Sequence, residues 1–479
     1  MFEGEPSVLL FMAGSVATAP LYIFLVRLKG TGSVGSSLQI RGQDDMISLS
    51  LKKEKRRSNM GNKQEWKADR TRIQSWIEHL SQFNATPGTG NTRQLFTQED
   101  IGGRRYIIDE MKALGLEVSC DDIGNIYGVC KGSGEGLSPV WSGSHIDTVY
   151  QGGAFDGISG VVCAMEAVRM IREKGIPHKR DLVVTVFSGE EPARFGMGCI
   201  GSRVLSGHLT TDQAKKLMDP DGISLYEAAK QAGYTPDCLE RSIKKPGDVY
   251  ASVELHIEQN ALLEREGLPL GVVTSICAPS NFVVEVTGRS AHAGGMSMED
   301  RRDAFTAACE MALAVEECGR NESQSEYSTA TVGSVKVEPN QSNIIPGKVE
   351  FTIDIRDAGK ESKDHIGKMI LERMEAIAEK RGVQVSWRQQ NNDAPMPCDL
   401  HIMEKIERYS EEMGIPYKKM VSGAFHDSMF LGEFCPVGMI FVPSRDGLSH
   451  CPEEWTDYQY LETGSQVLAA VLAELANEE

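Results

Sequence analysis

Apolar residues recur at two different spacings along this chain of 479 residues. Helical spacing predicts amphipathic helices over residues 70–83 and 100–114. The continuous apolar run that begins at Leu182 is typical of a strand that helices cover on both faces, and residues 126–130 and 437–442 also read as strands. Because strands and helices of these kinds alternate, the pattern predicts an α/β fold with a mostly parallel sheet and helices on both faces.

A second pattern begins near residue 278, where apolar and polar positions alternate. The alternation is clear over residues 282–287, 349–355 and 383–387. It predicts strands with one solvent-exposed face, which are usually antiparallel. Helical spacing over residues 299–317 predicts a helix between the first two of these strands. This stretch therefore reads as a separate α+β domain.

The chain accordingly divides into an N-terminal extension, a first domain in two pieces, and a second domain inserted into it. We expect the following boundaries: extension 1–67, first domain 68–278 and 394–479, inserted domain 279–393. The length allows both domains a sizeable core.

The extension allows more than one interpretation. Residues 6–26 carry no charge, which is about the ~20 residues that a membrane-crossing helix needs, although Gly14 and Pro20 weaken that reading. Acidic residues precede the apolar run, so a cleaved signal peptide is disfavoured. The alternatives are a membrane anchor followed by a Gly/Ser linker at 30–37, an extension without a targeting role, or a leader upstream of a start at Met60. We expect a cytoplasmic protein, or one associated with the endoplasmic reticulum through residues 6–26.

Composition excludes some classes of function. The net charge of −18 argues against a nucleic-acid partner. The eleven cysteines include no CxxC pair, so they indicate reduced thiols rather than a disulfide framework.

Candidate chemistry begins at the end of a predicted strand. His145 and Asp147 lie two residues apart, so both side chains point to one face, where a carboxylate can orient a metal-binding imidazole. Asp156 follows after a Gly-rich turn, at the same carboxyl end of the sheet where α/β folds place ligands. A solvated surface pair is the alternative for these residues.

Further ligand candidates follow later strands. Glu190 and Glu191 end the apolar run that begins at Leu182, and two neighbouring carboxylates cannot easily do the same job. One can bind a metal while the other takes a proton from a metal-bound water. His256 and His450 lie in or just after strand-like segments. The combined set supplies enough nitrogen and oxygen ligands for two zinc-like ions that share one carboxylate: His145, Asp156, Glu191, His256 and His450.

These motifs carry a family resemblance. HxD, FDG, GEE, ELHIEQ and GLSHCPEE occur in this order, and the chain from about residue 70 onward resembles the two-metal amidohydrolases of the aminoacylase/carboxypeptidase clan. The most similar branch acts on allantoate, ureidoglycolate, β-ureidopropionate and N-carbamoyl amino acids, and is marked by a histidine where the peptidases have a carboxylate ligand, here His256. The resemblance implies a zinc-exopeptidase-like fold whose inserted domain serves as a lid and as the contact surface of a homodimer.

The resemblance also implies roles for the metal-site residues. Asp156 bridges two divalent ions, manganese or zinc, with cobalt or nickel also open. Glu190 acts as the general base. Glu191 and His450 are implied to bind one ion, and His145 and His256 the other.

Further residues are implied to bind substrate. His292 reaches the metal site of the other subunit and steadies the oxyanion, which suits a donor imidazole. Asn343 orients the substrate, and Arg356 grips its carboxylate as a planar guanidinium can. A structural salt bridge with a neighbouring aspartate is the alternative for Arg356. Gln259 and His426 complete the predicted set.

The substrate is suggested by loop residues. Pro192 and Phe425 stand where relatives acting on allantoate or N-carbamoyl amino acids more often have glycine. This context favours ureidoglycolate, hydrolysed to glyoxylate, ammonia and carbon dioxide in purine catabolism, with allantoate second and N-carbamoyl amino acids third. A binding or scaffold relative without catalytic activity is a further alternative, but it predicts the loss of a ligand or of the base, and all are present.

Overall fold

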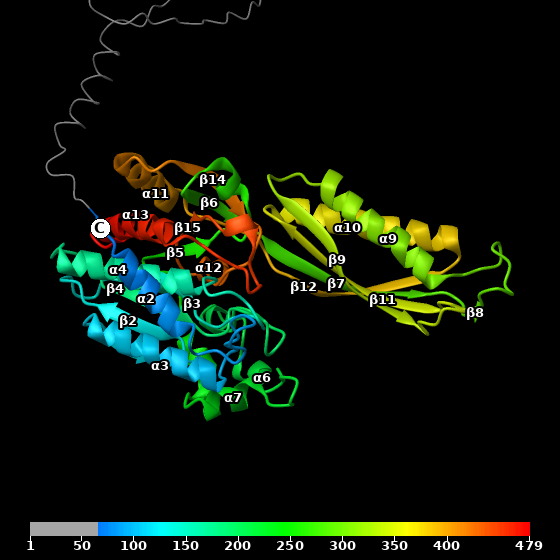
Figure 1. Ribbon diagram of the computed structural model, residues 1–479, viewed down its shortest axis with the longest axis horizontal. Coiled ribbons are helices and arrows are strands. Elements are labelled where there is room, and N and C mark those ends of the chain that lie inside the picture. Colours follow the sequence, from blue (N-terminus) through cyan, green and yellow to red (C-terminus); the bar gives the residue numbers. More distant parts are fainter. Residues whose placement is uncertain (1–65) are drawn as a thin grey trace, which may run out of the picture. The chain divides into compact units, whose positions relative to one another are not determined.

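The computed structural model describes residues 66–479 (Figure 1). The predicted anchor at 6–26 and the linker at 30–37 lie outside the described residues. Within the described part, no helix has both the length and the apolar character that a membrane crossing requires. All eleven cysteines lie in this part, and each is a free thiol.

One sheet of nine strands forms the larger part of the molecule. Its central strands β4, β3, β5 and β15 are parallel to one another, whereas the strands toward both edges include antiparallel pairs. The predicted α/β class is therefore confirmed. The strands, in sheet order, are β1 (Glu117–Cys120), β2 (Ile126–Cys130), β4 (Leu182–Phe187), β3 (Val140–His145), β5 (Ala251–Ile257), β15 (Val437–Val442), β6 (Leu270–Ile276) and β13 (Met396–Pro397), with β14 (Tyr417–Ser422) beside β6.

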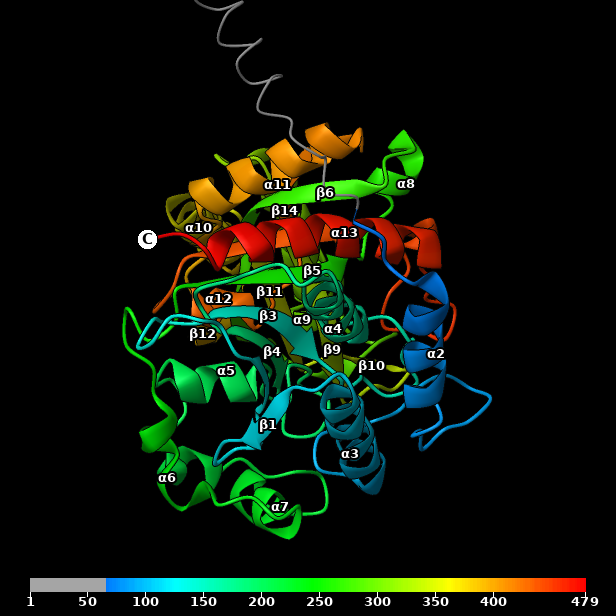
Figure 2. The same cartoon turned by 90° about the vertical axis from the view of Figure 1, so that its left-hand side faces the viewer.

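Helices cover both faces of this sheet. Successive residues of a strand point to opposite faces, so each face has an apolar cluster of its own. Val140 of β3 belongs to the main core, whereas its neighbour Trp141 packs in a second cluster with Leu205 and Leu431. Figure 2 shows α13 running along the strands on the side of the sheet that faces the viewer, and α13 packs against α4. The helices around the sheet are α2 (Arg70–Leu80), α3 (Gln98–Ala113), α4 (Ile158–Glu173), α5 (Ile200–Leu205), α6 (Thr211–Ala214), α7 (Leu225–Gln231), α8 (Leu262–Glu266), α11 (Leu400–Met413), α12 (Ser428–Leu431) and α13 (Tyr458–Leu475).

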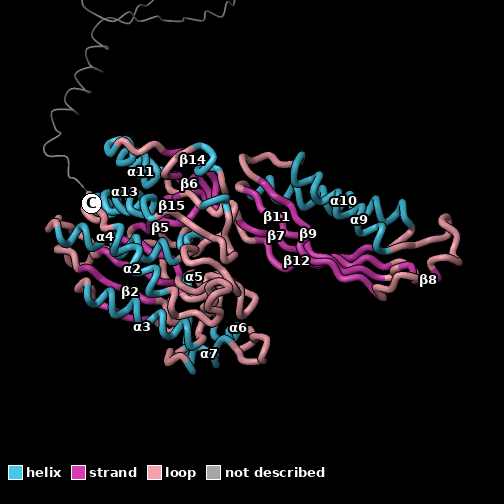
Figure 3. Tube along the Cα trace, viewed as in Figure 1, coloured by secondary structure: helices cyan, strands magenta, loops and turns pink. Residues whose placement is uncertain are grey.

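A second sheet has four antiparallel strands with a core of its own, as the alternating pattern predicts. Two helices lie on one side of it (Figures 1 and 3). The strands, in sheet order, are β12 (Gln384–Asn392), β7 (Ala278–Thr287), β11 (Lys348–Asp357) and β9 (Ser328–Glu338), and the helices are α9 (Ala304–Asn321) and α10 (Lys360–Arg381). A short pair, β8 (Ala291–His292) and β10 (Ile344–Ile345), stands apart from this sheet.

Both helices of the second domain differ from the sequence expectation. The helix predicted at 299–317 begins at Ala304, because Asp303 accepts hydrogen bonds from the amides of Phe305 and Thr306 and so caps it. Helix α10 was not predicted, because only a narrow stripe of its 22 residues is apolar.

Candidate active site

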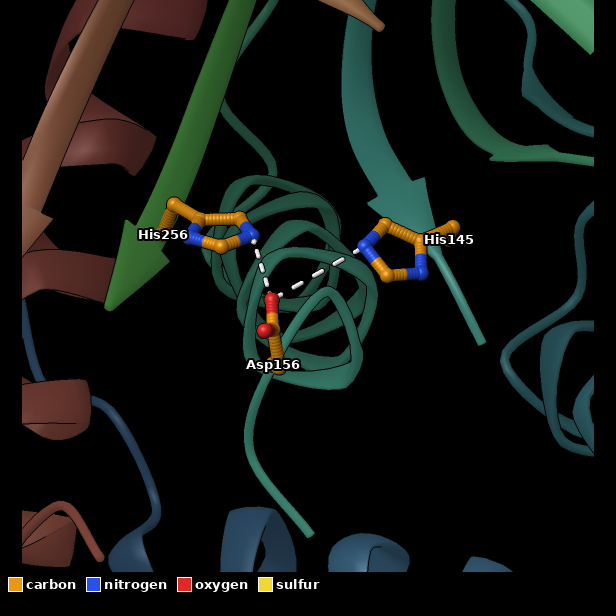
Figure 4. A group of neighbouring side chains, drawn as sticks. All are labelled: His145, Asp156 and His256. Carbon is orange, nitrogen blue, oxygen red and sulfur yellow. Dashed lines mark ion pairs between the residues drawn. The ribbon is translucent and has the colours of Figure 1, made fainter. Parts of the chain in front are cut away.

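The candidate site lies at the carboxyl ends of two parallel strands. His145 is the last residue of β3, and His256 is the penultimate residue of β5. Asp156 stands in the loop between β3 and α4, and Figure 4 shows both imidazoles facing its carboxylate. The chain turns into α4 at Gly157, whose φ of +66° favours glycine. The strand, turn and helix predicted from the sequence are therefore confirmed.

Asp156 separates the ligand candidates into two groups. Its Oδ1 atom lies 3.1 Å from His256 Nε2 and 3.9 Å from His145 Nε2. Its Oδ2 atom lies 3.2 Å from His450 Nε2, which is in turn 3.3 Å from Glu191 Oε1. Each carboxylate oxygen thus faces a different group, and the groups are the two that the resemblance implies.

Asp147 supports the site in a different way from the one predicted. The Nδ1 atom of His145 lies 3.0 Å from the main-chain oxygen of Asp147, closer than the 3.7 Å to its carboxylate. The carboxylate instead accepts hydrogen bonds from the main-chain amides of Glu190 and Glu191, at 3.3 Å and 3.1 Å. Asp147 therefore fixes the backbone that carries both glutamates as well as the ring of His145.

Glu190 and Glu191 diverge from this shared support. Glu191 points to His450, whereas Glu190 Oε2 lies 3.6 Å from His145 Nε2. Burial, followed by the neighbouring Glu191 carboxylate, raises the pKa of Glu190 well above its usual range. A carboxylate with a raised pKa is a stronger base, which suits proton transfer.

The donor set fits divalent metal ions of the zinc type. His145 and His256 each direct Nδ1 to a main-chain oxygen, so each Nε2 faces Asp156 as a ligating imidazole would. Burial lowers the pKa of His145 to about 4, which keeps this ring neutral. Hydrogen bonds with Asp156 and Glu191 raise the pKa of His450 to about 11, so the carboxylates favour positive charge at this position. Among the described residues, the ligand atoms of His145, Asp156 and His256 lie close enough together to hold an ion, as do those of Asp156, Glu191 and His450.

Gly157 leaves room for the ring of His145. We expect Gly157→Ala to lower the metal content per subunit severalfold or more. A Cβ atom at this position would lie 2.3 Å from His145 Nε2. Elemental analysis of the purified variant measures the effect. Gly175→Ala is the matched control, since its φ is +61° and a Cβ there meets nothing within 4 Å. Equal metal content in both variants would contradict the prediction, because both place a Cβ at positive φ and only the one at residue 157 meets His145.

Gln259 and His426 both lie next to the ligand candidates. Gln259 Nε2 donates to Asp156 Oδ2 at 2.7 Å, while its Oε1 atom is buried with no partner among the described residues. His426 is 2% exposed and packs edge-on against His256, with ring centroids 4.5 Å apart. Its Nε2 atom lies 2.9 Å from Ser422 Oγ. Burial lowers the pKa of His426 well below its usual value.

The predicted residues of the second sheet fall into two places. Arg356 lines a cavity of about 510 Å³ together with Pro192 and Phe425. Its guanidinium pairs with Asp354 at 3.0 Å, the salt bridge weighed above as the alternative, and also donates to the main-chain oxygen of Gly423. His292 and Asn343 lie together elsewhere, on and beside the β8–β10 pair.

The imidazole of His292 has a defined hydrogen-bonding pattern. Its Nδ1 atom accepts from the amides of Gly294 and Gly295, both at 3.1 Å. In a neutral ring the proton therefore sits on Nε2. Within the described chain, no hydrogen bond or ion pair joins His292 to the metal-ligand candidates.

Two supporting residues were missed by sequence reasoning. Glu454 is buried and accepts from the amides of Phe155 and Asp156, at 2.9 Å and 3.0 Å. Ser449 Oγ lies 2.9 Å from Asp156 Oδ2 and 2.8 Å from the Glu454 carboxylate. Both residues belong to the motif GLSHCPEE, so their proximity to His450 was the available signal.

Comparison with known proteins agrees with this geometry. The family model described as peptidase family M20/M25/M40 matches residues 141–474. The chain belongs to this family. Peptidase family M20/M25/M40 is metal-dependent, and the predicted class of amidohydrolase is confirmed by its relatives. The chain is 40% identical to the ureidoglycolate hydrolase of Arabidopsis thaliana, over 84% of this chain and 86% of the relative. It is 38% identical to an N-carbamoyl-L-amino acid amidohydrolase of Geobacillus stearothermophilus, over 85% and 99%.

A solved structure extends the family likeness to three dimensions. The crystal structure of AtUAH in complex with (S)-hydroxyglycine matches with a TM-score of 0.75 and 38% identity, covering 85% of this chain and 98% of that one. The predicted zinc-exopeptidase-like fold with an insertion is thereby confirmed.

Proposed function

We propose that this protein hydrolyses the carbamoyl amide of ureidoglycolate to give glyoxylate, ammonia and carbon dioxide. The observation that carries the proposal is the position of Asp156, whose two oxygens face two separate ligand groups. The carboxylate of Glu190 lies beside the first group, near His145. The proposed ligands are His145 and His256 for one divalent ion and Glu191 and His450 for the other, with Asp156 shared. Manganese or zinc suits this nitrogen and oxygen set.

The proposed roles follow from what each side chain can do. When bound, the two ions would activate a water molecule near neutral pH and polarise the carbamoyl oxygen. Glu190 takes the proton of the attacking water and delivers it to the departing nitrogen. Arg356 holds the substrate carboxylate, and the unpaired Oε1 of Gln259 accepts a ureido N–H group. Cleavage leaves carbamate, which decays to ammonia and carbon dioxide, and hydroxyglycine, which loses a second ammonia to give glyoxylate.

Substrate choice is supported by the cavity that Arg356 lines. Pro192 and Phe425, the two loop residues that favour ureidoglycolate in the sequence, both face it. The similarity to a ureidoglycolate hydrolase points the same way. An N-carbamoyl amino acid is the second candidate, because a relative with that activity is nearly as similar. Allantoate, which the sequence alone places second, becomes the third candidate.

We also propose that residues 279–393 form a lid and dimerisation domain. Strand β9 lies at an edge of the four-stranded sheet, and its Val335 is exposed. The exposed Leu313 lies on α9, the helix packed against β9. An unpaired edge with apolar residues suits pairing with a second copy of the chain.

The direct test is ammonia release by the manganese- or zinc-loaded protein. We expect faster turnover of ureidoglycolate than of allantoate or an N-carbamoyl amino acid offered at equal concentration. Preference for another ureido acid would keep the mechanism and reject the use of Pro192 and Phe425. Silence on all three, with metal bound, would reject the proposed function.

A further inference from the structure

Lys363 is buried where the chain passes between the two sheets. It lies in the first turn of α10 and is only 1% exposed. Its Nζ atom donates to the main-chain oxygens of Ala278 and Pro279, at 3.3 Å and 3.5 Å, and to that of Asp393. A lysine ammonium has three donors, so three carbonyl oxygens use all of them.

These carbonyls belong to the two chain crossings, the points at which the chain enters and leaves the four-stranded sheet. Ala278 and Pro279 begin β7, the first strand of the four-stranded sheet. Asp393 directly follows Asn392, the last residue of β12, where the chain leaves that sheet. The Asp393 amide also donates to the Pro279 oxygen at 3.3 Å. One side chain therefore binds the entering and the leaving strand together.

The contacts continue from Asp393 to the loop beside the catalytic glutamates. The Asp393 carboxylate pairs with Arg203 of α5 at 3.3 Å. The Arg203 Nε atom donates to the oxygen of Gly198 at 3.0 Å, in the loop that follows Glu191. Arg203, Pro279 and Asp393 line the same cavity as Arg356. The positions of Arg203, Pro279 and Asp393 therefore affect the position of Arg356 relative to that loop.

Ordinary helix stability does not explain this arrangement. Lys360 and Lys368, on the same helix, point to solvent and pair with acidic residues one turn away. Burial instead lowers the pKa of Lys363, while Asp364 and Asp393 oppose that change. A buried ammonium is costly unless its hydrogen bonds are satisfied, so Lys363 stays in place only while both crossings stay together.

We propose that Lys363 is a positioning residue, which clamps the two crossings and, through Asp393 and Arg203, holds Arg356 in register with the loop that carries Glu190. The consequence for catalysis rests on the proposed function, in which Arg356 binds the substrate carboxylate. The clamp itself does not depend on it.

The test compares Lys363→Met with Lys368→Met in the full-length, metal-loaded protein. Methionine keeps the apolar stem and removes the three donors. For Lys363→Met we expect hydrogen–deuterium exchange at residues 276–282 and 390–396 to accelerate about tenfold or more, the scale of a lost charge-assisted hydrogen bond. Exchange in the interior of β11 should stay as in Lys368→Met. Unchanged exchange at the crossings would overturn the clamp.

Kinetics on the best ureido substrate give the second readout. A displaced Arg356 raises KM about tenfold with a smaller change in kcat, whereas a merely structural defect lowers the amount of active protein and leaves KM unchanged. Unchanged KM with accelerated exchange would overturn the positioning role. If no ureido acid is hydrolysed, the proposed function fails, and the exchange data still decide on the clamp.

A second variant covers the case in which Lys363→Met does not fold. Asp393→Asn keeps the main-chain oxygen that Lys363 binds and removes the ion pair with Arg203. We expect accelerated exchange at the same two segments, smaller than for a lost lysine. Exchange equal to that of Lys368→Met would overturn the proposal.

Discussion

Replacing Glu190 with glutamine is expected to lower kcat by about 10²- to 10⁴-fold while the metal content stays unchanged, because glutamine keeps the shape of the side chain but cannot take a proton. Glu190 is buried, and its Oε2 atom lies 3.6 Å from Nε2 of His145, a ring that burial keeps neutral. Its carboxylate is not shared with His450, which pairs with Glu191 and Asp156. The measurement is ammonia release together with elemental analysis of the same sample.

The neighbouring glutamate supplies the matched control. Glu191→Gln removes a proposed ligand, so that variant should lose metal as well as activity. Glu453→Gln changes an exposed glutamate of the GLSHCPEE motif and should alter neither quantity. A fully active Glu190→Gln variant would remove the base assignment, and a metal-free one would show that Glu190 is itself a ligand.

Glu190 and Glu191 show how much of the candidate site can be predicted from the sequence. Ligand candidates can be predicted because strands of a parallel sheet end at one edge, so residues that follow different strands meet there. His145 and His256 are such residues, and the structure brings them to either side of Asp156. The different directions of the Glu190 and Glu191 side chains also follow from the sequence, since adjacent side chains diverge. Which of the two binds a metal is implied only by the family resemblance and stays a prediction.

Supporting contacts are harder to predict because they depend on distances that no local pattern encodes. Asp147 serves His145 through its main-chain oxygen, and its carboxylate reaches amides more than forty residues away. Glu454 reaches the amide of Asp156 across 298 residues. Lys363 could not be distinguished from the exposed lysines of α10 until the two crossings were placed beside it.

His292 is expected to act on the metal site of the partner subunit in the proposed homodimer. The His292→Ala variant alone should lose about 10²- to 10³-fold in kcat, as enzymes do when a donor to the oxyanion is removed. The structure supports this role, because two glycine amides donate to Nδ1 and leave the Nε2 proton free to donate. The β8–β10 pair sets the backbone of His292 opposite Ile344, and the next amide, of Ala293, donates to the main-chain oxygen of Asn343, the other residue proposed to meet the substrate from this domain.

Mixing two inactive proteins tests whether the site is shared. In a heterodimer of His292→Ala and Glu190→Gln chains, the site built on the His292→Ala chain keeps its Glu190 and receives an intact histidine from the partner. Random exchange of subunits should therefore restore up to about a quarter of the wild-type activity, one working site in half of the dimers. Mass spectrometry of differently tagged chains verifies the exchange, and each variant mixed with itself is the control. If verified heterodimers stay inactive, His292 does not act across the interface, because a histidine that served its own chain could not rescue either variant.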